Sequence, residues 1–139
     1  MRLLLVDGDP DALMKSADAL RRQYPDAQIN ATTDAMDAVQ YSLNHPVDAV
    51  YTEVLMPRCS GFDVVRLVRK FHPQAATYIL SATERFAAQA QNQRIRGYLL
   101  KSVLWAQTDG REALELTEDE LNWVAAAGES ERPSPKQPQ

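Results

Sequence analysis

The stretch VDAVYTEVLMPRCSGF, residues 47–62, decides the fold that we expect for this chain. It starts with a short apolar strand at 48–52, passes through the carboxylate of Glu53 into a loop, and reaches a helix at Gly61. Open α/β sheets build their sites where a strand ends and a loop leads into a helix. The stretch therefore predicts an α/β protein with Glu53 at its functional edge.

Strand and helix patterns alternate on both sides of this stretch. Short continuous apolar runs are typical of strands covered on both faces, whereas apolar residues three or four apart indicate helices. The expected strands lie at 3–6, 28–31, 48–52, 77–80 and 97–100, and the expected helices at 10–24, 34–44, 61–71 and 83–93. The alternation predicts a doubly wound, five-stranded parallel sheet with helices on both faces.

The helices present apolar residues that we expect to face the sheet. These residues are Leu13, Ala17, Leu20 and Tyr24, then Ala35, Val39 and Leu43, then Val64, Val65, Val68 and Phe71. The helix at 83–93 has three alanines, three glutamines and only a ragged apolar stripe, which predicts loose docking.

Four polar residues each follow an expected strand directly: Asp7, Glu53, Ser81 and Lys101. The carboxyl ends of parallel strands meet at one edge of the sheet, and a reversal of strand order near the first strand brings the first and third strands together. The sequence therefore predicts that these four side chains form one site.

Composition limits the function classes. The chain has 139 residues with 15 basic and 19 acidic side chains, a net charge of −4 and no basic run, which argues against nucleic-acid binding. The single Cys59 excludes an internal disulfide and fits a reducing, cytoplasmic setting. A membrane helix needs about 20 consecutive apolar residues. No stretch of the sequence approaches this length, so we expect no membrane segment.

The pattern changes after Lys101. Residues 102–116 fit no single helix well and read as an atypical insertion before the last helix. Asp109-Gly110 between two partly apolar runs indicates a hairpin, and a short helix at 103–107 followed by a turn is the alternative.

The last helix is expected at 117–127, where Thr117 and Glu120 form a capping box. Residues 129–139 contain three prolines and no large apolar side chain, so we expect a disordered tail. The folded domain would then span residues 1–128.

The runs LLLVDGDP, TEVLMPRCSGFDV, YILSA and GYLLK resemble, in order and spacing, the response-regulator receiver domains of two-component signalling. The resemblance covers about residues 1–101 and implies a flavodoxin-like (βα)5 fold. In that family a strand-end Asp accepts a phosphoryl group from a sensor histidine kinase. Two acidic residues help to bind Mg²⁺, and a Ser or Thr, an aromatic residue and a Lys complete the site.

The resemblance assigns a role to each matching position of this chain. Glu53 stands at the phospho-acceptor, Asp7 and Gly8 at the acidic pair, Ser81 at the hydroxyl switch, Tyr98 at the aromatic switch and Lys101 at the lysine.

Two departures affect the phosphoryl chemistry. Glu53 extends the acceptor carboxylate by one methylene, about 1.5 Å, and phosphoryl transfer depends on positioning. Gly8 removes one oxygen ligand, so Asp7 and Glu53 would bind Mg²⁺ weakly or not at all. Asp9 could supply the missing carboxylate, but its place before Pro10 favours a helix N-cap.

A third departure is Ser102, which replaces the proline that usually follows the family lysine. The Lys101–Ser102 peptide is then expected to be trans, because cis bonds are almost confined to proline. We also expect an ion pair between Lys101 and Glu53, which would mimic part of the phosphorylated state without any chemistry.

Three functions stay open at this point. The favoured one is a non-enzymatic pseudo-receiver that signals without phosphorylation through protein–protein contacts. The second is a phospho-accepting receiver with an unusual site. The third is a phosphohydrolase of the haloacid-dehalogenase type, with Asp7 as nucleophile, Asp9 as acid, and Ser81 and Lys101 at its next motifs.

The expected partner is a protein, namely a histidine kinase, a downstream effector or a second copy of the chain. The face made by the helix at 83–93, the strand at 97–100 and the last helix would bind it. Trp105 is the interface candidate, since tryptophan is enriched among interface hot spots. The alternative is that Trp105 folds back over the sheet edge.

Overall fold

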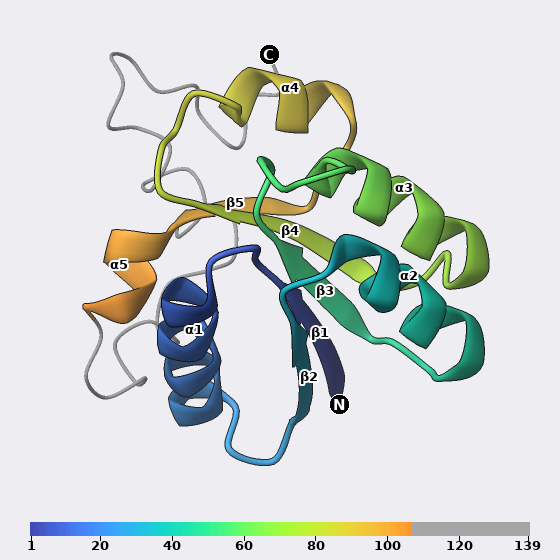
Figure 1. The fold of residues 1–139 in the computed structure, drawn as a ribbon, viewed down its shortest axis with the longest axis horizontal. Helices are drawn as coiled ribbons and strands as arrows, with labels where there is room; N and C mark the ends of the chain where they lie inside the picture. Colours follow the sequence, from blue (N-terminus) through green and yellow to red (C-terminus); the bar gives the residue numbers. More distant parts are fainter. Residues whose placement is uncertain (107–139) are drawn as a thin grey trace.

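Strands and helices alternate along residues 1–106, which are the residues that the structure, a computed structural model, describes (Figure 1). The elements are β1 (Arg2–Val6), α1 (Pro10–Gln23), β2 (Gln28–Thr32), α2 (Ala35–Asn44), β3 (Ala49–Thr52), α3 (Gly61–Phe71), β4 (Ala76–Ser81), α4 (Ala87–Asn92), β5 (Gly97–Leu100) and α5 (Lys101–Trp105). The predicted α/β alternation is confirmed.

The five strands form one parallel sheet in the order β2-β1-β3-β4-β5. The order reverses beside β1, so β1 and β3 are neighbours and Val6 pairs with Thr52 at their ends. The carboxyl ends of these two strands therefore meet, which brings Asp7 and Glu53 together as predicted. β2 and β5 are the edge strands.

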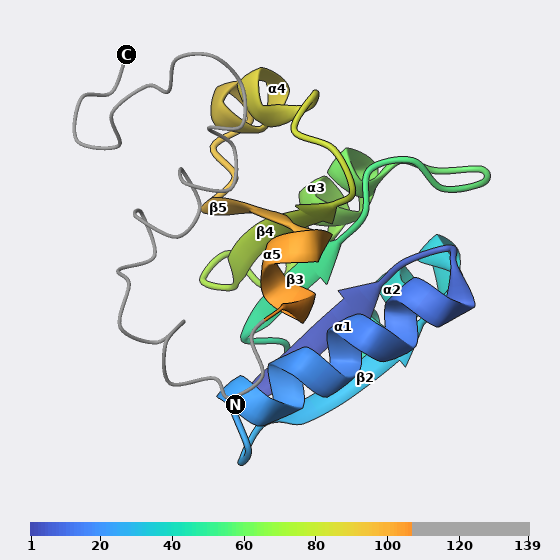
Figure 2. The ribbon, with the colours of Figure 1, turned by 90° about the vertical axis from the view of Figure 1, so that its left-hand side faces the viewer.

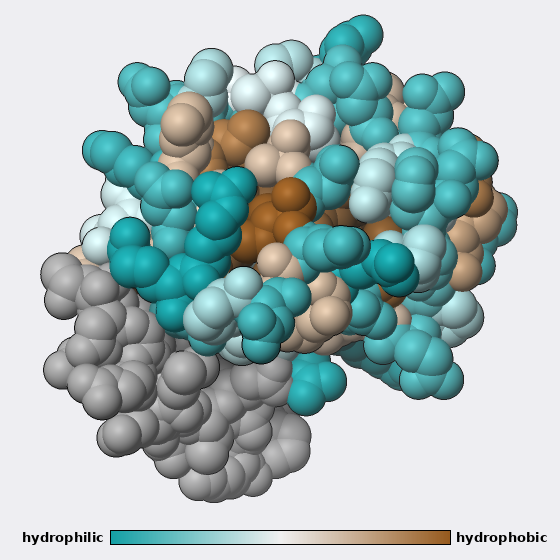
Figure 3. All heavy atoms as spheres, turned by 90° about the horizontal axis from the view of Figure 1, so that it is seen from below, coloured by the Kyte–Doolittle hydropathy of each residue, from teal (hydrophilic) through white to brown (hydrophobic). Residues whose placement is uncertain are grey.

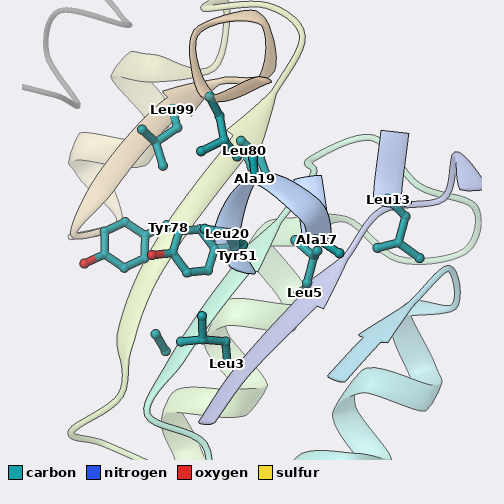
Figure 4. Close-up of a cluster of buried hydrophobic side chains, with 12 residues drawn as sticks. Leu3, Leu5, Leu13, Ala17, Ala19, Leu20, Tyr51, Tyr78, Leu80 and Leu99 are labelled. Atoms are coloured by element: carbon teal, nitrogen blue, oxygen red, sulfur yellow. The ribbon is translucent and has the colours of Figure 1, made fainter. Parts of the chain in front are cut away.

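The core has a layer on each face of the sheet. On one face, α1 and α5 cover Leu5 of β1 and the stacked rings of Tyr51 and Tyr78, whose centroids lie 4.6 Å apart (Figures 2 and 4). On the other face, α2 and α3 cover Leu4 and Val50. Burial on both faces explains why the strands read as continuous apolar runs.

Polar caps fix where α1 and α3 begin. Asp9 is the N-cap of α1, and its Oδ1 accepts hydrogen bonds from the backbone N–H groups of Asp11 and Ala12, at 3.0 and 3.4 Å. Ser60 and Asp63 form a capping box that starts α3. These caps satisfy N–H groups that have no partner within the helix.

The expected helix at 83–93 is wrong at its N-terminal end, because α4 covers only Ala87–Asn92. The polar groups of the preceding turn are satisfied in other ways. Thr83 Oγ1 accepts from Arg85 N–H at 3.2 Å, and the hydroxyl of Tyr98 donates to Thr83 O and accepts from Phe86 N–H. Side-chain partners of this kind compete with helix formation.

Two expected core residues are exposed. Leu43 and Phe71 are 51% and 44% exposed. Leu43 is the second-to-last residue of α2, and Phe71 is the last residue of α3. The buried positions on the same helices include Ala38 and Phe62 instead.

The chain turns directly from β5 into α5 at Lys101. Of the two interpretations of residues 102–116, the described part agrees with the short helix, although that helix starts two residues earlier than expected. The peptide between Lys101 and Ser102 is trans, as predicted. Asp109-Gly110, the helix at 117–127 and the tail at 129–139 lie outside the described residues.

The surface is largely hydrophilic around a small apolar hollow in the view from below (Figure 3). A pocket of 220 Å³ at the N-terminal edge of the sheet is lined by residues that include Leu3, Tyr24, Asp48 and Arg96. No helix within residues 1–106 is long and apolar enough to cross a membrane.

Candidate functional site

Asp7, Glu53, Ser81 and Lys101 come together at the carboxyl edge of the sheet. They lie at or directly after the ends of β1, β3, β4 and β5, as the sequence predicted. Above them a cavity of 310 Å³ opens to solvent. Its lining consists of Asp7, Gly8, Asp9, Glu53, Leu55, Pro57, Ser81, Ala82, Thr83, Phe86 and Lys101.

The centre of the site is a buried cluster of three charges, formed by Asp7, Glu53 and Lys101 and called the ion cluster below. The Nζ atom of Lys101 lies 2.6 Å from Oδ2 of Asp7 and 2.9 Å from Oε2 of Glu53. The three side chains are only 4–12% exposed. The ion pair expected between Lys101 and Glu53 is present, and Asp7 shares the same ammonium group.

The surroundings of Lys101 raise its pKa above the ordinary value. Burial alone lowers this pKa, because it disfavours the charged amine. Hydrogen bonds to Asp7 and Glu53 and the charges of both carboxylates act in the opposite direction and prevail. Lys101 is therefore a permanent cation at neutral pH.

Both carboxylates also bind backbone N–H groups. Glu53 Oε1 accepts from the N–H of Val54 at 2.8 Å, so the extra methylene lets the side chain turn back over its own loop. Asp7 Oδ1 accepts from the N–H of Asp9 at 2.9 Å. Each carboxylate thus has one oxygen on the backbone and the other on Lys101.

The residues present do not fit a tight Mg²⁺ site in this arrangement. The ammonium group of Lys101 already lies against the free oxygens of Asp7 and Glu53. Gly8 supplies no ligand, and Asp9 uses Oδ1 for the cap of α1. Within residues 1–106, no group of three or more carboxylate, histidine or cysteine side chains is arranged to hold a metal ion.

Ser81 and Tyr98 form a hydrogen-bonded pair beside the ion cluster. The ring of Tyr98 is turned inward and is 3% exposed. Its hydroxyl is hydrogen-bonded to Ser81, to the carbonyl oxygen of Thr83 and to the N–H of Phe86. Burial raises the pKa of Tyr98, the N–H of Phe86 and Ser81 lower it, and the charges of Glu53 and Glu84 raise it further, so the net shift is upward.

Trp105, the last residue of α5, lies away from the cavity and contacts α1. Its indole Nε1–H donates to Oγ of Ser16 at 2.9 Å, and the ammonium of Lys15 lies 5.1 Å from the ring centroid. The ring packs partly buried against the core. This arrangement corresponds to the alternative in which Trp105 folds back, and a role in partner binding stays a prediction.

Several contributors to this geometry were not predicted from the sequence. The backbone groups of Val54, Thr83 and Phe86 bind site side chains, and no residue type announces a backbone contact. Ser16 did carry a signal, since it is a hydroxyl at helical spacing within the apolar face that contains Leu13.

Comparison with known proteins supports the fold and gives the family. The model of the response regulator receiver domain family matches residues 3–119. No curated protein sequence matches the chain. Because the family model covers most of the sequence, this chain belongs to the response regulator receiver domain family.

Solved structures share the fold at low sequence identity. An uncharacterized protein of Neptuniibacter caesariensis is 22% identical, with a TM-score of 0.67 over 82% of this chain and 84% of that one. TrrA of Thermotoga maritima, in complex with Mg²⁺ and BeF, is 20% identical, with a TM-score of 0.63 over 82% and 93%.

The RcsB response regulator of Salmonella typhimurium is 17% identical, with a TM-score of 0.66 over 83% of this chain. The aligned region spans 58% of the RcsB chain. Likeness at this identity concerns the fold alone, and function is argued from the site.

Proposed function

We propose that this chain is a pseudo-receiver, a non-enzymatic signalling module that acts through protein contacts without cycling through phosphorylation. The observation that carries the proposal is the position of Lys101 Nζ between Asp7 Oδ2 and Glu53 Oε2. In this arrangement the lysine that would contact a phosphoryl group is neutralised by the protein's own carboxylates. We place this signalling in the cytoplasm.

The chemistry of phosphoryl transfer gives the physical reason. The acceptor oxygen must lie in line with the donor, and cations must neutralise the developing charge. Here Glu53 Oε1 is held by the N–H of Val54, and Oε2 is held by Lys101. A Mg²⁺ ion would have to displace Lys101 from a buried ion pair, which costs several kcal/mol.

The inward Tyr98 supports the same proposal. In receivers the corresponding aromatic residue turns inward on activation, which links the site to the face expected from α4, β5 and the last helix at 117–127. Tyr98 is held inward by bonds to Ser81, Thr83 and Phe86 while Glu53 is unmodified. We infer that the ion cluster keeps the chain in one signalling state.

The enzyme alternative has less support. A haloacid-dehalogenase-type reaction needs the second carboxylate of Asp7-Gly8-Asp9 as an acid in the cavity. Asp9 Oδ1 is instead occupied by the N–H groups of Asp11 and Ala12 at the start of α1.

Treatment with acetyl phosphate and Mg²⁺, followed by intact mass measurement, tests the proposal. Wild type is expected to gain no mass, whereas the double variant Gly8→Asp/Glu53→Asp, which restores the family residues, is expected to gain one HPO₃ group. The double variant is the matched control for the activity of the reagent. A stable HPO₃ adduct on Glu53 of wild type would contradict the proposal and favour a phospho-accepting receiver.

The signal would pass to a histidine kinase, to a downstream effector or to a second copy of the chain through the face expected from α4, β5 and the last helix at 117–127. Sedimentation velocity of the full chain separates a second copy from the other two partners. If a second copy is the partner, Ala88→Arg on exposed α4 abolishes self-association and Gln40→Arg on exposed α2 does not. A monomer at all concentrations would assign the face to another protein.

A further inference from the structure

We propose that Ser16 of α1 and Trp105 of α5 are positioning residues that hold Lys101 between Asp7 and Glu53. The inference rests on the proposed function, because it concerns the same ion cluster. It adds the side chains, remote from the cavity, on which the geometry of that cluster depends.

The helix α5 is too short to be stable in isolation. It covers only five residues, Lys101–Trp105, and its N-cap residue Leu100 makes no side-chain cap hydrogen bond. A helix this short is not stable by its own hydrogen bonds, because nucleation is unfavourable. Contacts with the rest of the protein must therefore fix its orientation.

The side chains at the two ends of α5 point toward the same part of the protein. Lys101 and Trp105 are four residues apart, so they project from the same face of one helical turn. That face lies against the β1–α1 unit: Lys101 reaches Asp7 at the end of β1, and Trp105 reaches Ser16 within α1. Figure 2 shows α5 beside α1. The short helix is thus held at both ends by polar contacts to one unit.

The hydrogen bond between Trp105 and Ser16 is buried at its Ser16 end. Ser16 is 0% exposed and accepts the indole N–H of Trp105 at 2.9 Å. Breaking this bond leaves a buried hydroxyl without its donor, which carries a desolvation penalty. Ser16 therefore specifies one orientation of the indole ring, and the apolar contacts of Leu104 add affinity without the same directionality.

The hydrogen bond between Ser16 and Trp105, called the anchor below, is connected to the ion cluster through the backbone of α5. No linker separates β5 from α5, because β5 ends at Leu100 and the helix starts at Lys101 itself. A change in the tilt of α5 therefore moves the backbone of Lys101. Two contacts of 2.6 and 2.9 Å to different carboxylates leave little freedom for such a movement.

The reactivity of the Lys101 amine tests the inference on the full chain. Reductive methylation, followed by peptide mass mapping, reports how often each lysine is free of its ion pair, with exposed Lys70 as the internal reference. Two variants remove the anchor: Ser16→Ala deletes the acceptor, and Trp105→Phe keeps an aromatic ring but lacks the N–H.

We expect both variants to speed the methylation of Lys101 by about fivefold, the effect of one lost hydrogen bond on local opening. The rate at Lys70 should not change. Ser42→Ala is the matched control, because Ser42 is also a buried helical serine, 1% exposed, that donates to Val39 O. Ser42→Ala should leave Lys101 as slow as in wild type.

Each other outcome has a defined meaning. Unchanged Lys101 rates in the anchor variants, or an equal increase in Ser42→Ala, would overturn the positioning role and leave the proposed function intact. Wild-type Lys101 reacting as fast as Lys70 would show that the ion cluster does not form, and the proposed function would fail with it. If Ser16→Ala does not fold, Trp105→Phe decides the result.

Discussion

Gly61, the first residue of α3, approaches the backbone of Glu53 so closely that a side chain does not fit. A β-carbon added to Gly61 would lie 2.0 Å from the carbonyl oxygen of Glu53 and 3.1 Å from Oγ1 of Thr52. The N–H of Gly61 also donates to the carbonyl oxygen of Val54 at 2.9 Å. The start of α3 therefore fixes the loop that carries the Glu53 carboxylate.

We predict that Gly61→Ala destabilises the fold by about 2–3 kcal/mol, the range for overpacking a rigid site. Urea denaturation measures the loss. Gly8→Ala is the control, because a β-carbon there would meet only Pro57 Cδ at 3.4 Å and Met56 Cγ at 3.9 Å. Equal stability of the two variants would show that the loop can shift away from Gly61.

Lys101→Met should lower the free energy of unfolding by about 3–5 kcal/mol, because it leaves two buried carboxylates without their cation. Arg66→Met is the matched control. Arg66 pairs with Asp63 at 3.1 Å, but these side chains are 66% and 41% exposed, and an exposed pair contributes less than about 1 kcal/mol. Similar losses in both variants, measured by urea denaturation at pH 7, would argue against a buried ion cluster.

Mg²⁺ should bind with a Kd in the millimolar range or weaker, since Lys101 competes for Asp7 and Glu53. This corresponds to a binding free energy of about −4 kcal/mol or one closer to zero. Gly8→Asp is expected to tighten binding at least about tenfold by adding a carboxylate. Gly8→Asn, which has the same size without the charge, should not. Titration followed by NMR gives the affinities, and tight wild-type binding would indicate that Lys101 leaves the ion cluster.

Stability should fall at alkaline pH through Lys101 and Tyr98. Both pKa values are raised in the folded protein above the ordinary 10.5 and 10.0. Their contributions are therefore complete below these ordinary values and are lost as the pH rises through the folded-state pKa. Urea denaturation from pH 8 to 11 should show a shallower decline for Tyr98→Phe than for wild type. Parallel pH profiles would exclude a buried, protonated Tyr98.

Much of the fold could be predicted because burial on both faces leaves a plain signal in the sequence. The apolar runs ending at Val6 and Thr52 gave β1 and β3, and Asp9-Pro10 gave the start of α1. The start of α4 could not be predicted, because the hydroxyl of Tyr98 binds the preceding turn from 12 residues away. The exposure of Leu43 could not be predicted either, because helical spacing alone does not reveal which end of a helix is left exposed.

The sequence by itself determined which residues lie at the carboxyl edge of the sheet, because each of Asp7, Glu53, Ser81 and Lys101 lies at or directly after the end of a strand and parallel strands end together. Only the tertiary structure decided how they interact. Lys101 pairs with both carboxylates, and Trp105 turns toward Ser16. These choices depend on distances between residues 48 to 94 positions apart in the chain, which arise when the sheet forms and α5 packs on α1.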